Sequence, residues 1–426
     1  MKSAQSSTKK EQELNLQELL SSHIENIRSR HFRSCGSLTD FDFIMTCLRR
    51  VITQNESGRD FLQYLQEVDD KNIPRSTFFE ALKSPRRLAV LKNIERSYHL
   101  HLSRKLLDMG IDFLDAFPEL NGYEIFSGDG HFVGHPTHTK RSAKNGKVYP
   151  AGNVYILNMR NGLIQHFVAV TDGSTKGHEL PTFKNEIINN NTGSQTIWVL
   201  DRAYIDHRFW EKQKKAGGYL ISRTKSNSSI THCGYNPFDK DDPVNAGVVA
   251  DYNGGFTNTK YTMRIIEYID PETGEDITFF TTLNRKILPG VICWLYFLRW
   301  RIEKSFDCFK NSFGEKKGWA NGKNAIQIQG IATCMVYNFI HFLSEAVKFD
   351  QNCSDSKAEK KYLASLDKRA EKAKRHGRFI HPLILFTRTV SRISSQFIRV
   401  VRNHFYSKKP LRLIIPIFVK RLEAYL

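Results

Sequence analysis

Cysteine is scarce in this sequence, and the few cysteines present form no recognisable framework. The 426 residues contain seven cysteines, an odd number, and no two of them stand in a C-x-x-C arrangement. This excludes a secreted disulfide scaffold and a zinc ribbon, because both need cysteines in pairs at regular spacings. We expect reduced, mostly structural cysteines.

Long hydrophobic runs are also missing. No stretch approaches the roughly 20 apolar residues that span a bilayer, and the first residues, "MKSAQSSTKKEQELN", lack the apolar core of a secretory signal. The sequence therefore predicts a soluble protein of the cytoplasm, without membrane partners.

Acidic residues are fewer than basic ones. Lysine and arginine number 63 against 44 for aspartate and glutamate, which gives a net charge of +19. The last 76 residues, 351–426, hold 18 of these bases and only 5 acids, and the basic residues of 366–379 and 392–405 alternate with apolar ones. Such an excess favours a polyanionic partner such as nucleic acid, and a solvated basic surface is the alternative.

Residue patterns divide the chain into five regions. The pattern is helical over 1–118 and mixes strands with helices over 119–225. Gly, Asn and Asp punctuate 226–282 as in β-hairpins. The pattern is helical again over 283–345, and 346–426 is basic and helical. We assign the first region to DNA binding, the second and fourth to one core, and the third to a β-rich insertion.

The order of elements predicts the fold class. The strands "YEIFSGDG", "NVYILNM" and "IQHFVAV" follow one another, and helix and strand then alternate through "TIWVLDRAY" and "GYLISRT". This order predicts an α/β protein, with a mixed sheet flanked by helices and interrupted by the insertion, and with helical N- and C-terminal regions.

A possible DNA-binding motif lies in the N-terminal region, in "NIPRSTFFEALKSPRRLAVLKNI". Thr77 and Glu80 have the spacing of a capping box, and Arg86 and Arg87 follow on a second predicted helix. These two helices form either a helix-turn-helix motif or part of a plain helical bundle.

The segment "YFLRWRIEKSFDCFK", residues 296–310, mixes charged and aromatic residues with apolar ones. On one continuous helix, Tyr296, Arg299, Glu303 and Lys310 share a stripe about 60° wide, because each residue advances by about 100°. A neighbouring apolar stripe anchors this helix to a core. The carboxylate thus lies at the border of the core with cations on either side, a place suited to a metal and a phosphate.

The spacing Tyr-x2-Arg-x3-Glu-x6-Lys resembles the YREK motif of bacterial insertion-sequence transposases of the DDE class. Two aspartates stand where such an enzyme needs them, because Asp129 and Asp201 each end a predicted strand. "DRAY" around Asp201 is also similar to the family's usual sequence. The resemblance covers roughly residues 119–345 and implies a ribonuclease-H-like core in which Asp129, Asp201 and Glu303 are the catalytic carboxylates.

The implied chemistry is metal-dependent cleavage and strand transfer. Asp129, Asp201 and Glu303 are suitable ligands for two Mg²⁺ ions, with Mn²⁺ as a substitute, because these ions prefer carboxylate oxygens. Lys310 and Arg299 would bind phosphates and Tyr296 would donate a hydrogen bond to one. An Arg at the position of Arg223 is frequent in the family, which implies a contact with DNA, and a plain surface role is the alternative.

The resemblance implies the partners as well. The enzyme would bind the terminal inverted repeats of its own element, pair two ends within a homodimer, cut them and join them to target DNA, in association with the nucleoid. Two alternatives remain: a transposase-derived DNA-binding protein that no longer cuts, and another ribonuclease-H-like nuclease without strand transfer.

Other residues offer alternative site assignments. His131, His135 and His138 allow a zinc site. Asp172 is an alternative catalytic carboxylate, but its sequence context is more typical of a turn.

Overall fold

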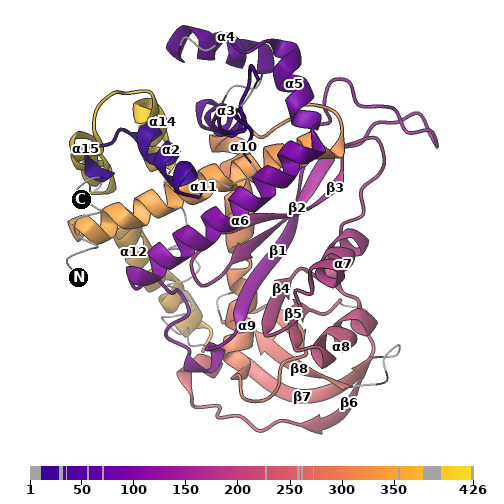
Figure 1. Cartoon of the computed structure of the whole chain (residues 1–426). Helices are drawn as coiled ribbons and strands as arrows, with labels where there is room; N and C mark the ends of the chain where they lie inside the picture. Colours follow the sequence, from indigo (N-terminus) through magenta and orange to yellow (C-terminus); the bar gives the residue numbers. More distant parts are fainter. Residues whose placement is uncertain are drawn as a thin grey trace.

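A nine-stranded mixed sheet runs through the computed structural model, in the order β3-β2-β1-β4-β5-β9-β8-β7-β6 (Figure 1). The structure describes residues 11–27, 32–34, 36–54, 57–69, 72–225, 228–256, 260, 262–271, 273–353, 356–377 and 395–423. Part of the predicted basic segments, residues 378–394, lies outside this range. The strands are β1 (Glu124–Val133), β2 (Ala151–Asn158), β3 (Ile164–Thr171), β4 (Thr196–Leu200), β5 (Gly218–Arg223), β6 (Ile230–Tyr235), β7 (Val248–Phe256), β8 (Thr262–Ile269) and β9 (Asp276–Thr281).

The middle of the sheet is parallel and its flanks are antiparallel. Strand β4 pairs in parallel with β1 and with β5, whereas β2 and β3 continue antiparallel from β1. The β-rich tract, strands β6 to β9, forms antiparallel hairpins, and β9 pairs with β5. The predicted mixed sheet of a ribonuclease-H-like α/β fold is therefore confirmed, and the strands of the tract extend this sheet instead of forming a separate one.

Helices cover both faces of the sheet. They are α2 (Leu16–Asn26), α3 (Asp40–Thr53), α4 (Gly58–Asp69), α5 (Arg75–Lys83), α6 (Pro85–Asp108), α7 (Glu179–Asn190), α8 (His207–Lys215), α9 (Pro289–Leu298), α10 (Trp300–Ser312), α11 (Lys323–Gln351), α12 (Ser356–Arg375), α14 (Ser395–Phe405) and α15 (Leu411–Glu423). Short 3-10 turns are η1 (Pro118–Leu120), η2 (Arg202–Tyr204) and η3 (Pro243–Asn245).

Successive residues of β1 show the two layers, because side chains on a strand alternate between faces. Ile125 belongs to the buried cluster that includes α9, whereas Phe126 packs against Trp198 in the cluster that includes α7 and α8. One face of the sheet is thus covered by α9, α10 and α11, and the other by α7 and α8 (Figure 1).

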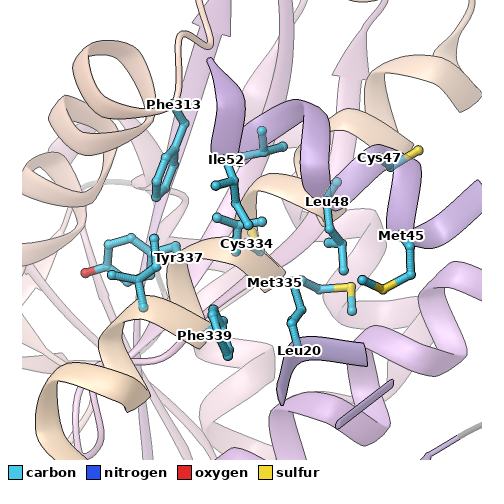
Figure 2. Packing of buried hydrophobic residues seen from close by; sticks show 14 of the residues in the cluster. Leu20, Met45, Cys47, Leu48, Ile52, Phe313, Cys334, Met335, Tyr337 and Phe339 are labelled. Atoms are coloured by element: carbon cyan, nitrogen blue, oxygen red, sulfur yellow. The ribbon is translucent and has the colours of Figure 1, made fainter. Parts of the chain in front are cut away.

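Helix α11 is the central core helix. Leu20 of α2 and Leu48 and Ile52 of α3 gather around its residues Met335 and Phe339 (Figure 2). By length and composition α11 is apolar enough to cross a membrane, but 94% of its apolar window is buried inside the protein. Its hydrophobicity is therefore explained by its place in the core, since a buried core helix can be as long and as apolar as a membrane-spanning one.

The predicted capping box in the N-terminal region is wrong. Helix α5 begins at Arg75, directly after Pro74, so Thr77 lies inside the helix. The next helix, α6, is capped by Ser84, whose hydroxyl accepts from the Arg87 amide. The N-cap is therefore Pro74, three residues before the expected Thr77, and the φ of proline suits the entry to a helix.

The two arginines of that region bind within the protein. Arg86 makes two hydrogen bonds to the carboxylate of buried Asp40, at 2.6 and 2.7 Å. Arg87 donates to the Leu38 carbonyl and lies over the ring of Phe43. Both side chains therefore hold α6 against the segment that begins α3.

Candidate active site

Asp129 and Asp201 follow a pair of residues that lie side by side in the sheet. The parallel register of β1 and β4 places Gly128 opposite Leu200, and the next residue of each strand is one of the two aspartates. Neighbouring strands lie about 4.8 Å apart. The two carboxylates therefore share the carboxyl edge of the parallel part of the sheet.

Strand β1 does not end at Asp129, contrary to the prediction. It runs on to Val133, because β2 pairs with it as far as Ala151 opposite Val133. Pairing with β4 nevertheless stops at Gly128. Asp129 thus lies where β1 loses one of its two neighbours, and this opens the sheet on the side of Asp201.

The segment that carries Glu303 is two helices and not the single helix expected. Helix α9 ends at Leu298 and α10 begins at Trp300, with Arg299 between them. The amide of Arg299 donates to the Tyr296 carbonyl and the amide of Ile302 donates to the Arg299 carbonyl, at 3.1 and 3.0 Å. These i to i+3 bonds tighten the chain at Arg299 and leave Glu303 in the first turn of α10.

Arg299 joins two of the three predicted carboxylates. Its guanidinium donates to Glu303 Oε1 at 2.8 Å and lies 3.4 Å from Asp129 Oδ2. The Arg299 side chain is buried, whereas that of Glu303 is more than a third exposed. Burial alone would lower the pKa of Arg299, but Tyr296, Glu303 and the two aspartates raise it above its ordinary value. One cation therefore contacts Asp129 and Glu303 and interacts electrostatically with Asp201.

The surroundings of the Asp129 carboxyl disfavour its ionised form. Burial raises its pKa to about 6, and the negative charges of Glu179 and Glu303 add to the rise, while Arg299 opposes it. A carboxylate that is poorly solvated and surrounded by other acids is stabilised by any further cation. Perturbed acids of this kind are typical of functional sites.

Tyr296 and Arg223 line a cavity of about 540 Å³ next to the aspartate of β4. Arg223 ends β5, and its guanidinium is paired with Glu275 at 2.6 Å. The cavity walls combine bases, acids and rings: Asp201, Arg202, Arg223, Tyr296, Trp300 and Lys304. Its basic and aromatic lining is suited to a phosphodiester chain.

Lys310 lies further along α10 and is exposed. It is close enough to His131 of β1 that its charge, after burial, contributes to lowering the pKa of that histidine to about 4. The His131 ring stacks on Phe306 and its Nε2 lies 3.6 Å from Glu315. His131 is thus a largely buried residue packed against aromatic rings, which does not support a zinc site.

Two residues that the sequence did not single out also lie at this edge of the sheet. Glu179 begins α7, and its Oε2 accepts a hydrogen bond of 2.8 Å from the hydroxyl of Tyr204. No motif marks Glu179, because only the tertiary fold brings the start of α7 next to β1. Tyr204 did carry a signal, since it belongs to the "DRAY" sequence, but no role was assigned to it.

The carboxylates at this edge of the sheet are of the chemical type that binds a divalent metal. Within the described part of the chain, no group of three or more His, Cys, Asp or Glu side chains is close enough together to hold an ion. The carboxylates of Asp129 and Glu303 nevertheless bind one cation, the Arg299 guanidinium, and Asp201 acts on it electrostatically. Carboxylate oxygens are the ligands that Mg²⁺ prefers in proteins.

Comparison with known protein families gives one match. The family model described as "Transposase DDE domain" matches residues 120–339, slightly more than half of the chain. The matched range begins just before β1 and ends within α11, so it includes the sheet, both aspartates and Glu303. No curated protein matches the chain.

Proposed function

The chain belongs to the transposase DDE domain family, and from that premise we propose that it is an insertion-sequence transposase with the YREK motif. It binds the terminal inverted repeats of its element and catalyses metal-dependent cut-and-paste cleavage and strand transfer. The observation that carries the proposal is the adjacency of Asp129 and Asp201 beyond Gly128 and Leu200, with Glu303 linked to Asp129 through Arg299.

Asp129, Asp201 and Glu303 are the residues that would hold the metal. When bound, two Mg²⁺ or Mn²⁺ ions supply activation of the attacking oxygen and stabilisation of the leaving oxygen. Arg299 already neutralises Asp129 and Glu303. If these carboxylates were to hold a metal, the Arg299 guanidinium would be free to bind a phosphate.

The DNA lies along the cavity next to Asp201. Tyr296 donates a hydrogen bond to a phosphate, and Arg299, Arg223 and Lys310 neutralise phosphates, because guanidinium and ammonium groups are the usual phosphate ligands. Arg223 is available once Glu275 releases it. The exposed Lys310 binds the strand further along α10.

The remaining regions supply recognition and assembly. The helical region 1–118 and the basic region 346–426 bind the transposon ends and form the homodimer that pairs two of them. The core is formed by 119–225 and 283–345, with 226–282 as the β-rich insertion. The protein acts in the bacterial cytoplasm, at the nucleoid.

A cleavage assay tests this function. The substrate is double-stranded DNA that carries the two flanks of the gene, where the inverted repeats of an element would lie, incubated with Mg²⁺ or Mn²⁺. We expect nicks at both flanks by the unmodified protein and none by Asp201→Ala. Asp172→Ala is the matched control, because Asp172 accepts hydrogen bonds from the backbone amide and hydroxyl of Ser174 in a turn.

The outcomes separate the alternatives. Absence of cleavage by the unmodified protein, with tight binding to the same DNA, would indicate a DNA-binding protein that does not cut. Cleavage without joining of a pre-cut end to a plasmid would indicate a nuclease without strand transfer. Full activity of Asp201→Ala would refute the assigned site.

A further inference from the structure

Glu179 approaches Asp129 from the opposite face of the sheet. Side chains of β1 alternate, so Asp129 faces α10 while Gly130 faces α7. A Cβ placed on Gly130 would lie 2.4 Å from Glu179 Oε1 and 2.9 Å from its Oε2. The carboxylate therefore rests directly on the backbone of Gly130, and a side chain at this position would have to displace it.

Tyr204 connects Glu179 to the second aspartate. Its buried hydroxyl donates to Glu179 Oε2 at 2.8 Å. It also ends the 3-10 turn that follows Asp201 directly, and its amide donates to the Asp201 carbonyl at 2.9 Å. The Glu179–Tyr204 hydrogen bond thus ties the residue after Asp129 to the turn after Asp201.

The negative charge of Glu179 lies close to Asp129 as well. The Glu179 carboxylate rests on the backbone of Gly130, the residue directly after Asp129. A negative charge at this position favours a cation beside the aspartates.

We propose that Glu179 is a positioning residue of the active site, which sets the spacing of Asp129 and Asp201 through Tyr204 and strengthens cation binding by its charge. This inference rests on the proposed metal-dependent function. Glu179 touches neither the metal nor DNA in this role, and Gly130 is glycine because a side chain would displace the Glu179 carboxylate.

Two substitutions separate the hydrogen bond from the charge. Glu179→Gln keeps an oxygen that can accept from Tyr204 and removes the charge, whereas Tyr204→Phe keeps the charge and removes the bond. Glu186→Gln, on the same helix, is the control, because Glu186 accepts hydrogen bonds from Asn190. Folding of each variant is checked by its thermal unfolding.

The first readout is Mn²⁺ binding to the full chain without DNA, followed by electron paramagnetic resonance. We expect Glu179→Gln to weaken binding about three- to tenfold, which corresponds to one lost charge interaction, and Glu186→Gln to leave it unchanged. Unchanged binding in Glu179→Gln would overturn the charge contribution.

The second readout is DNA cleavage as a function of Mg²⁺ concentration. Glu179→Gln should shift the half-activating concentration upward and recover near-normal rates at saturating Mg²⁺, while Tyr204→Phe should lower the rate at every concentration. Normal rates in Tyr204→Phe would overturn the positioning role. Complete loss in Glu179→Gln at saturating Mg²⁺ would instead make Glu179 a catalytic ligand and refute the proposal as stated.

The two proposals fail in different ways. If the unmodified protein cleaves no DNA, the proposed function fails, and the Mn²⁺ titration still decides the charge of Glu179. If either variant does not fold, Gly130→Ala tests the same contact, since the added methyl must displace the Glu179 carboxylate. It should then weaken Mn²⁺ binding as Glu179→Gln does, and unchanged binding would contradict the proposal.

Discussion

Arg223 of β5 and Glu275 of the turn before β9 form an ion pair, with 2.6 Å between guanidinium Nη2 and carboxylate Oε1. Both side chains line the cavity next to Asp201. They are about a third and a half exposed, so the pair contributes little to stability. Its consequence is functional, because Glu275 occupies the arginine that we assign to DNA.

Glu275→Gln should tighten DNA binding. The free Arg223 can then neutralise one more phosphate, which adds about one unit to the slope of log affinity against log salt. We expect roughly two- to fivefold higher affinity at low salt in fluorescence anisotropy, with stability changed by less than about 0.5 kcal/mol.

The control for Glu275 is Asp241→Asn, which removes an exposed acid of the same β-rich tract. An equal gain in affinity there would show a general charge effect and contradict the specific pair. Combining Glu275→Gln with Arg223→Ala should abolish the gain.

Arg299→Ala should destabilise the protein when no divalent metal is present. It leaves the Asp129 and Glu303 carboxylates without their shared cation, which we expect to cost about 2 kcal/mol of unfolding free energy. Added Mg²⁺ or Mn²⁺ should recover part of this loss, because the ion replaces the guanidinium. Urea unfolding with a chelator measures the loss of stability, and urea unfolding with added metal measures its recovery.

Arg285→Ala is the matched control, since Arg285 is exposed and follows β9. It should change neither stability nor the effect of metal. A loss in Arg299→Ala that metal does not reduce would show that Arg299 and the metal do not compete for the same carboxylates.

The fold was predictable from the sequence because its strands are short, apolar and clearly bounded. The hairpin of β8 and β9 follows from the Gly, Asn and Asp residues that punctuate 226–282, and the confirmed mixed sheet follows from the order of strands and helices. Strand pairing was not predictable. That β9 joins β5, and so extends one sheet, depends on contacts between residues about 60 positions apart.

Local errors had local causes. Periodicity alone describes residues 289–312 as one helix, because no proline or glycine marks the break at Arg299. Glu179 was missed for a different reason, since its proximity to Gly130 arises from packing between α7 and β1. The proposed roles of the site residues remain predictions.

Lys310→Gln should slow cleavage and weaken DNA binding with little effect on folding. Lys310 is exposed, so its removal should change stability by less than about 0.5 kcal/mol. One lost phosphate contact should lower the slope of log affinity against log salt by about one unit. Anisotropy at several salt concentrations measures this slope.

Lys348→Gln on α11 is the control for Lys310, because Lys348 pairs with Glu345 away from the proposed site. Equal losses in both variants would mean that only total charge matters. An unchanged salt slope in Lys310→Gln would remove Lys310 from the DNA contacts.

Glu95 predicts a pH dependence of stability. This buried residue of α6 accepts a hydrogen bond from the His166 amide at 2.9 Å. Burial raises its pKa to about 8, against the bond from His166 and the charges of Lys92 and Arg96. Because the folded pKa lies above the unfolded value, its contribution to stability is fully present below about pH 4.5 and is lost as pH rises through about 8.

Glu95→Gln should therefore flatten the stability profile at high pH. The Gln oxygen can accept the same bond without a charge, so the variant should resemble the unmodified protein at pH 5 and exceed it at pH 9. One pKa unit corresponds to about 1.4 kcal/mol, which gives a gain on the order of 3 to 5 kcal/mol. Urea unfolding across this range, with Glu80→Gln as the exposed control, measures the difference. A constant difference between Glu95→Gln and the unmodified protein at all pH values would show that Glu95 does not titrate in this window.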